Sequence, residues 1–173
     1  MNKEKKGFDT RAIHAGQKND PVTGAVMTPI YATSTYAQES PGVHKGYEYS
    51  RTSNPTRKAL EDCIASLENG DQGFAFASGM AATSTILELL DSGDHVIASD
   101  DLYGGTYRLM EDVRKRTSSL DFSFVDFSKT SNILDAIKPN TKMLWLETPS
   151  NPLLKITDLE EIVSAINQKN IIK

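Results

Sequence analysis

The stretch GFAFASGMAATSTILELLDSGDHVIASDDLYGG, residues 73–105, sets the fold class. Its apolar start at 73–77 predicts a short buried strand, and a helix then follows up to a Ser-Gly stop. A second apolar run at 95–98 predicts the next strand, and a Gly-Gly turn opens a helix over about 105–116. Strands that alternate with helices favour a parallel sheet, because parallel strands need a long crossover between them.

The same alternation continues toward the carboxyl end. Strands are predicted at 122–125 and 143–146, and a Thr157–Glu160 capping box predicts a helix after the second of them. Ile171-Ile172 predicts the opening of a fifth strand, so we expect the sequence to be truncated. Because the strands are apolar without alternation, we predict an α/β fold with a mostly parallel sheet and helices on both faces.

Residues 1–54 have a different character. Glycine and proline recur, and the helical period is weak, which predicts an extended N-terminal arm without a core of its own. Asn54-Pro55 then predicts a helix start, with a capping residue followed by proline at the first helical position. We therefore expect an arm at 1–54 and an incomplete α/β domain at 55–173.

Composition excludes several classes of protein. Of the 173 residues, 38% are hydrophobic and 24% charged, which is typical of a folded chain. The net charge of −4 gives no basic surface for nucleic acid or an anionic membrane, and no apolar run reaches the roughly 18 residues of a membrane span. The single Cys63 excludes an internal disulfide, and no Cys/His cluster has zinc spacing. We expect a cytoplasmic protein without metal.

Residues 78–80, Tyr103 and Asn151 each follow a predicted strand, where parallel sheets bind ligands. Ser78-Gly79-Met80 opens a helix, and the free amides there favour a phosphate, although capping by Ser78 alone is the stronger interpretation of this feature. Tyr103, beside two glycines, can stack on a planar ring or be an ordinary surface aromatic.

Arg51 lies in the predicted arm, and Asn151 follows the strand predicted at 143–146. Arg51, with Tyr49, suits phosphate oxygens, although a solvated arginine is the more common case. Asn151, in a loop with two prolines, can donate to and accept from a polar ligand, or belong to an ordinary turn. No Gly-x-Gly-x-x-Gly, Walker lysine or Ser/His/Asp set occurs, so dinucleotide, P-loop and triad chemistry are not indicated.

The order of these motifs is more specific than any one of them. From about Thr10 to the end, the chain resembles the Cys/Met-metabolism family of pyridoxal-phosphate enzymes, which contains cystathionine γ-lyase, γ-synthase and β-lyase. The resemblance implies the large domain of the fold-type I enzymes and pyridoxal 5'-phosphate as cofactor. It rests on Tyr49-Ser50-Arg51, Phe76-Ala77-Ser78-Gly79-Met80, Asp101-Leu102-Tyr103-Gly104-Gly105 and Glu147-Thr148-Pro149-Ser150-Asn151-Pro152.

The resemblance also implies roles for the phosphate-side residues. Ser78, Gly79 and Met80 match the turn whose backbone donors hold the cofactor phosphate. Tyr49 and Arg51 match residues that reach the phosphate of a neighbouring subunit, which implies a homo-oligomer with shared sites.

For the ring side, Tyr103 matches the tyrosine that stacks on the pyridine ring and assists proton transfer. Asn151 matches an asparagine near the O3′ atom and the substrate carboxylate, and Glu147 belongs to the same loop.

The chain departs from the family pattern at the reacting centre. The lysine that forms the Schiff base lies in a Ser-x-Thr-Lys-Tyr segment, which is absent here, and Lys129 stands in a different context. The aspartate that pairs with the pyridinium nitrogen belongs to the strand that would begin near Ile171. The resemblance therefore implies that the chain alone lacks γ-elimination activity.

Several functions stay open. The resemblance favours γ-elimination on cystathionine or a related sulfur amino acid, with γ-synthase, β-lyase and methionine γ-lyase as alternatives. A different class is an inert truncated product, or a non-catalytic partner of a full-length homologue. A third is a phosphate-binding α/β protein unrelated to pyridoxal.

Overall fold

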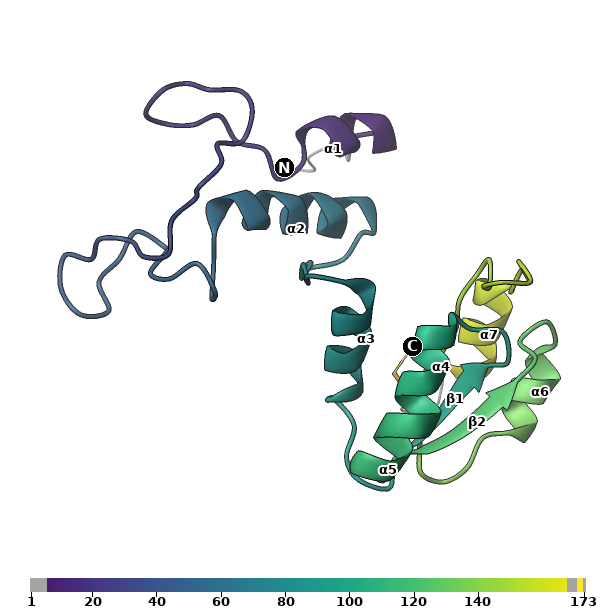
Figure 1. Cartoon of the computed structure of the whole chain (residues 1–173). Helices are drawn as coiled ribbons and strands as arrows, with labels where there is room; N and C mark the ends of the chain where they lie inside the picture. Colours follow the sequence, from purple (N-terminus) through teal and green to yellow (C-terminus); the bar gives the residue numbers. More distant parts are fainter. Residues whose placement is uncertain (1–5, 168–170, 173) are drawn as a thin grey trace. The chain divides into compact units, whose positions relative to one another are not determined.

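The computed structural model describes residues 6–167 together with Ile171 and Ile172 (Figure 1). Residues 1–5, 168–170 and 173, at the ends of the predicted arm and domain, lie outside the described residues. The described chain forms two compact units, which are divided in sequence between Phe76 and Ala77. The expected boundary at residue 54, between an arm and a domain, stays a prediction. No helix in the described part is long and apolar enough to span a bilayer.

The first unit is built on the predicted helix α2, Pro55–Leu67. The side chain of Asn54 caps it by accepting from the amide of Thr56 at 2.9 Å, so the predicted helix start is confirmed. A second helix, α1 at Phe8–His14, was not expected in the arm. Because contact with a neighbouring helix stabilises such a short helix, periodicity alone does not reveal it.

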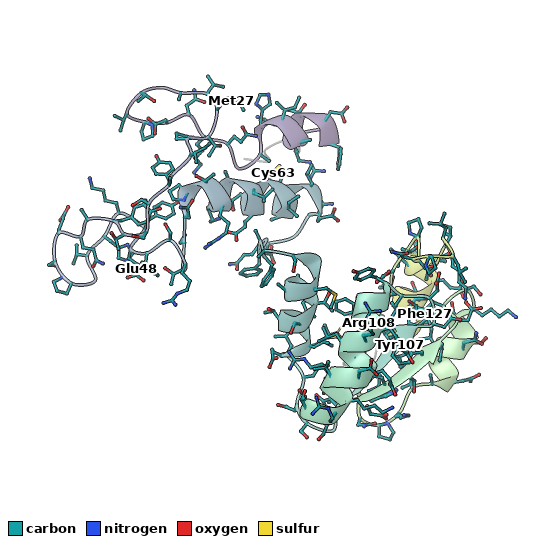
Figure 2. The ribbon with its side chains drawn as sticks, viewed as in Figure 1. Met27, Glu48, Cys63, Tyr107, Arg108 and Phe127 are labelled. Atoms are coloured by element: carbon teal, nitrogen blue, oxygen red, sulfur yellow. The ribbon has the colours of Figure 1, made fainter. Side chains whose placement is uncertain are left out.

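The contact between the two helices is partly polar. The guanidinium of Arg11 donates to the backbone oxygen of Ser66. Cys63 faces α1 in Figure 2, with its Sγ 3.9 Å from the backbone oxygen of Ala12.

The predicted strand at 73–77 is wrong. The segment has no ladder partner among the described residues, and Phe74 is 73% exposed. Instead, the amide of Ala75 donates to Glu61 Oε1 on α2 at 3.0 Å. An apolar run becomes a buried strand only where a neighbouring strand takes its backbone hydrogen bonds.

The second unit contains the predicted parallel sheet. Its centre is β1, His95–Ser99, with β2, Asp121–Val125, on one side and β3, Thr141–Trp145, on the other. All pairings are parallel, which confirms the strands expected near 95, 122 and 143. Ile172 continues the sheet beside β3, with its amide 2.8 Å from the backbone oxygen of Lys142, as expected for a further strand opening.

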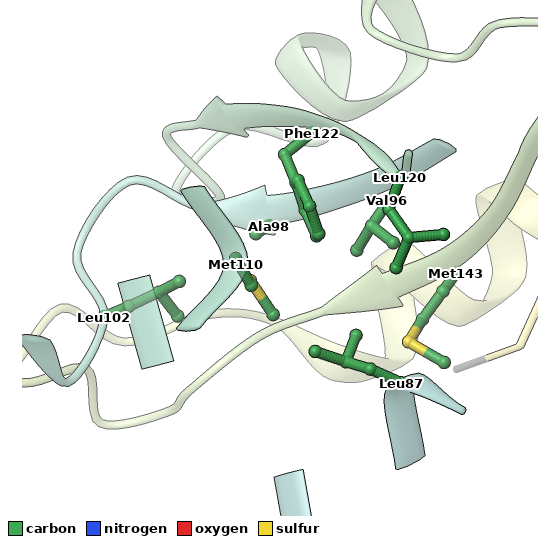
Figure 3. Close-up of a cluster of buried hydrophobic side chains, with 8 residues drawn as sticks. All are labelled: Leu87, Val96, Ala98, Leu102, Met110, Leu120, Phe122 and Met143. Carbon is green, nitrogen blue, oxygen red and sulfur yellow. The ribbon is translucent and has the colours of Figure 1, made fainter. Parts of the chain in front are cut away.

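Helices cover both faces of this sheet. They are α4 at Gly104–Arg108, a π-helical turn η1 at Leu109–Arg114, α5 at Lys115–Thr117, α6 at Thr130–Asp135 and α7 at Leu159–Ile166. Helix α3, Gly79–Leu87, contacts α4 and adds its last residue, Leu87, to the core. One face packs the cluster drawn in Figure 3, which consists of Leu87, Val96, Ala98, Leu102, Met110, Leu120, Phe122 and Met143. The other face packs Ile97, Phe127, Ile133, Leu144, Ile162 and Ile166. The predicted burial of the sheet on both sides is confirmed.

The start of α7 differs from the predicted capping box. Asp158, not Thr157, is the N-cap, and its carboxylate accepts from the amide of Glu161 at 2.9 Å. Thr157 is buried, and its amide donates to Thr148 Oγ1 at 3.1 Å. The loop before the helix therefore engages the threonine, and the adjacent aspartate caps the helix instead.

Candidate functional site

The start of α3, the segment that follows β1 and the carboxyl end of β3 line a pocket of about 410 Å³. This is the edge where parallel sheets hold ligands. Four of the predicted site residues, Ser78, Gly79, Met80 and Tyr103, therefore line one cavity. The complete lining is Ser78, Gly79, Met80, Thr83, Tyr103, Thr106, Trp145 and Glu147.

The start of α3 has the properties of an anion site. Ser78 is its N-cap and accepts from the amide of Ala81 at 3.1 Å, so the capping interpretation is confirmed. The amides of Gly79 and Met80 donate to no group in the described part of the chain. Capping and anion binding are compatible here, because the cap uses one amide and leaves two at the positive end of the helix dipole.

Tyr103 contributes a half-exposed ring to the same pocket. Its amide donates to the Glu147 carboxylate, at 3.1 Å from Oε2 and 3.3 Å from Oε1. Gly105 leaves the space that this ring occupies: a Cβ atom there would lie 2.5 Å from Tyr103 Cε1 and 3.1 Å from Met80 Sδ. Gly105 is therefore the position that accommodates the Tyr103 ring.

Asn151 does not line the pocket. It is exposed in the loop that follows β3, one residue after the buried Ser150. Ser150 donates to the carboxylate of Asp101, in the loop that follows β1. The loop that carries Asn151 is thereby tied to the loop that carries Tyr103.

Tyr49 and Arg51 belong to the first unit. The Arg51 guanidinium lies 5.3 Å from the centre of the Tyr49 ring, and both side chains are exposed. Arg51 also lines a pocket of about 450 Å³ beside Arg57 and Glu61, whose side chains form an ion pair at 3.3 Å. This arginine is available to an anion, and its neighbours are residues of its own unit.

Sequence reasoning missed Trp145, Thr83 and Thr106 in the pocket lining. Residues 145 and 147 are two apart at the end of β3, and this strand period could have indicated Trp145 beside Glu147. The indole nitrogen Nε1 of Trp145 is buried and has no hydrogen-bond partner among the described residues.

Lys155, in the loop that follows β3, is not activated as a nucleophile. Lys155 Nζ lies 2.9 Å from Asp100 Oδ1 and 3.6 Å from Asp126 Oδ1. The hydrogen bond to Asp100 is the main reason that the pKa of Lys155 is raised. A lysine nucleophile needs a lowered pKa, so Lys155 is a structural cation. The described residues hold no group of three or more His, Cys, Asp or Glu that could bind a metal ion.

Comparison with known proteins gives a consistent assignment. Residues 9–173 match the family described as Cys/Met metabolism PLP-dependent enzyme. The chain is 65% identical to a cystathionine beta-lyase from Coxiella burnetii over 99% of its own length and 44% of that protein. It is 55% identical to a cystathionine gamma-lyase from Bacillus subtilis over 87% of its length and 39% of that protein.

A solved structure agrees with these relatives. The crystal structure of cystathionine gamma-lyase from Lactobacillus plantarum, complexed with L-serine, superposes with a TM-score of 0.91 and 46% identity. The match covers 96% of this chain and 43% of that one. The chain thus spans about half, or less, of the length of the relatives that it matches.

Proposed function

The chain belongs to the Cys/Met metabolism family of PLP-dependent enzymes, and we propose that Ser78, Gly79, Met80, Tyr103 and Asn151 form phosphate and ring contacts of its pyridoxal phosphate site. The observation that carries this proposal is the pocket shared by the start of α3, Tyr103 and Glu147. The whole protein would then act in transsulfuration, on cystathionine or a related sulfur amino acid.

The residues present fit the cofactor at both of its ends. The amides of Gly79 and Met80 would hold the phosphate, because an anion at a helix start satisfies donors that the helix leaves free. The Tyr103 ring would face the pyridine ring, and the absence of a side chain at Gly105 lets the tyrosine take its position. Asn151 would reach the ring oxygen or the substrate from the neighbouring loop.

Tyr49 and Arg51 are proposed to serve a second copy of the chain. Both are exposed on the unit that precedes the sheet, and a guanidinium suits phosphate oxygens. The active sites would then be shared within a homo-oligomer.

The cofactor supplies an electron sink for the substrate Cα carbanion. A lysine normally holds it covalently, and the 173 residues contain no Ser-x-Thr-Lys-Tyr segment. We therefore expect the chain alone to bind the cofactor noncovalently and to release no 2-oxobutanoate from cystathionine.

Two reactions are candidates for the whole protein. The order of motifs favours γ-elimination, which converts cystathionine and water into cysteine, 2-oxobutanoate and ammonia. The 65% identical beta-lyase favours β-elimination, which yields homocysteine, pyruvate and ammonia. Incubation of the protein from its native source with cystathionine distinguishes them by the 2-oxo acid. Borohydride reduction followed by intact mass would reveal a phosphopyridoxyl group on a lysine.

The binding proposal is tested at Gly79. A Cβ atom added there meets nothing within 4 Å, and Ser78 before it is extended, so both alanine and proline fit the first helical position. Gly79→Pro removes one amide donor, and we expect about 10-fold weaker binding of both phosphate and pyridoxal phosphate. Gly79→Ala keeps the donor and should bind as the unaltered chain does. Equal affinities of all three proteins would refute the phosphate assignment.

A further inference from the structure

Two carboxylates join the loops that follow β1 and β3. One belongs to each loop and accepts hydrogen bonds from the other loop. Asp101, in the loop after β1, is 6% exposed and accepts from groups of the loop after β3. Its Oδ2 atom receives the Ser150 hydroxyl and, at 2.9 Å, the amide of Leu153.

The reverse link comes from the loop after β3. Glu147 accepts the amide of Tyr103, in the loop after β1, on both of its oxygens. Each loop therefore provides an acid to the other. The donors bound by Asp101 also bracket Asn151 in sequence, and the donor bound by Glu147 is the backbone of Tyr103 itself.

We infer that Asp101 and Glu147 form a reciprocal clasp that positions Asn151 and Tyr103 for the cofactor ring. The inference rests on the proposed function, because that function makes the cofactor the shared ligand of Asn151 and Tyr103. Both acids are positioning residues. Glu147 acts through the amide of Tyr103, and Asp101 acts through Ser150 and Leu153, which flank Asn151.

Two observations separate the clasp from general electrostatics. The nearby cation Lys155 pairs with Asp100 and Asp126, while the partners of Asp101 are a neutral hydroxyl and an amide of one loop. Ser150 also closes its own loop, because its Oγ atom accepts from the amide of Lys155 at 2.8 Å. A carboxylate buried on such donors is directional, so it fixes where the loop lies.

The test compares two ligands of the chain, pyridoxal phosphate and inorganic phosphate. Quenching of Trp145, the single tryptophan and a pocket residue, reports the first, and competition reports the second. We expect Glu147→Ala and Asp101→Asn to weaken pyridoxal phosphate about 10-fold and phosphate less than about 2-fold. Ser150→Ala removes one of the two donors to the Asp101 carboxylate and should act in the same direction with a smaller effect. Glu160→Ala and Asp135→Asn, at exposed acids elsewhere in the unit, are the matched controls.

Coupling distinguishes positioning from mere stability. The effect of Glu147→Ala should disappear in a Tyr103→Ala background, and that of Asp101→Asn in an Asn151→Ala background. Equal weakening of both ligands, or additive losses in the double variants, would overturn the inference.

A separate measurement covers failure of the proposed function. If the unaltered chain binds pyridoxal phosphate no better than phosphate, the ring assignment is wrong, and so is the shared ligand of the clasp. Amide exchange then decides whether the clasp itself exists. Faster exchange at 101–103 in Glu147→Ala and at 150–153 in Asp101→Asn would support the link between the loops, and unchanged exchange would refute it.

Discussion

The two units of this chain differ in where their apolar side chains lie. Among the described residues before Ala77, only Ala65 is buried, and side chains such as Val22 and Ile30 are 89% and 86% exposed. Every other buried residue belongs to the second unit and packs around the sheet or its loops. The second unit thus has a core that supports a pocket, whereas the first is held by caps and close backbone contacts. Exposed apolar surface of this kind fits the proposed role of the arm against another subunit.

The sharpest test of this difference is one substitution made in both units. Ile97 is fully buried in the centre of the sheet, and Ile30 is almost fully exposed in the arm. We expect Ile97→Ala to lower the free energy of unfolding by about 3–4 kcal/mol, because it removes transfer energy and leaves a cavity. Ile30→Ala should change it by less than about 0.5 kcal/mol.

Denaturant unfolding, followed by the fluorescence of Trp145, measures how each substitution changes the stability of the second unit. To include the first unit, the opening of α2 is followed by amide exchange in the same variants. A comparable loss of stability from Ile30→Ala would mean that the arm side chain is covered, and the comparison between the units would fail.

The next prediction concerns close backbone contact in the first unit. Gly16 and Gly24 have nearly the same positive φ, +75° and +74°. A Cβ atom at Gly16 would lie 2.2 Å from the backbone oxygen of Ala59 on α2, whereas one at Gly24 meets nothing within 4 Å. Alanine at Gly24 should cost about 1 kcal/mol through backbone strain alone. Alanine at Gly16 should cost about 1–3 kcal/mol more through the clash.

Amide exchange of α2 in the two glycine variants isolates the clash, because the strain is common to both. Similar protection in Gly16→Ala and Gly24→Ala would show that the loop before α2 yields freely, and that this contact does not hold the unit together.

A smaller effect is expected at the cap of α2. Asn54 accepts from the amides of Thr56 and Arg57, and its amide group donates to the backbone oxygen of Tyr31 at 3.0 Å. Asn54→Ala should therefore lower the opening free energy of α2 by about 1 kcal/mol. Asn54→Asp keeps the acceptor and loses the donor, so it should retain the helix while loosening the link to Tyr31. If amide exchange of α2 is equally fast in Asn54→Ala and Asn54→Asp, the hydrogen bond to Tyr31 matters more than the cap.

The second unit was the predictable part of the fold. Its strands are short apolar runs bounded by turn residues, and each one finds a parallel neighbour, so local pattern and tertiary pairing agree. The run at 73–77 has the same pattern and no neighbour, and it forms no strand. Helix α1 is the reverse case, because its stability depends on contact with α2 rather than on its own residues. Pairing and docking are tertiary properties, so a single sequence does not report them.

The candidate site divides in a similar way. The helix start with free amides at α3 could be predicted, because a serine, a glycine and a helix start are local features. The glycine beside Tyr103 was also indicated by sequence. The reciprocal links of Asp101 and Glu147 could not be predicted, since they join residues 44 to 52 apart through loops whose course is set by the sheet. The resemblance to a family indicated Glu147, and no signal indicated that Asp101 would anchor the loop of Asn151.

The last test uses pH to separate the two units. His95 is fully buried at the start of β1, with Nδ1 2.8 Å from Thr141 Oγ1 and Nε2 2.9 Å from Ser123 Oγ. Burial of the ring is the main cause that lowers its pKa below the ordinary 6.5, with a smaller contribution from Lys138. The unfolded chain therefore takes up a proton at a higher pH than the folded one, and acid favours unfolding. The stability from the neutral ring is fully present above about pH 6.5 and decreases as pH falls toward the lowered pKa of the folded state.

His95→Gln keeps hydrogen-bonding groups without a titrating ring, so unfolding of the second unit should lose less stability between about pH 7 and pH 5 than in the unaltered chain. His44, exposed in the first unit, provides the control. His44→Gln should leave the pH dependence of the stability of the second unit unchanged. If His44→Gln reduces this pH dependence and His95→Gln does not, protonation acts on the arm. The acid sensitivity of the chain would then originate outside the core that supports the pocket.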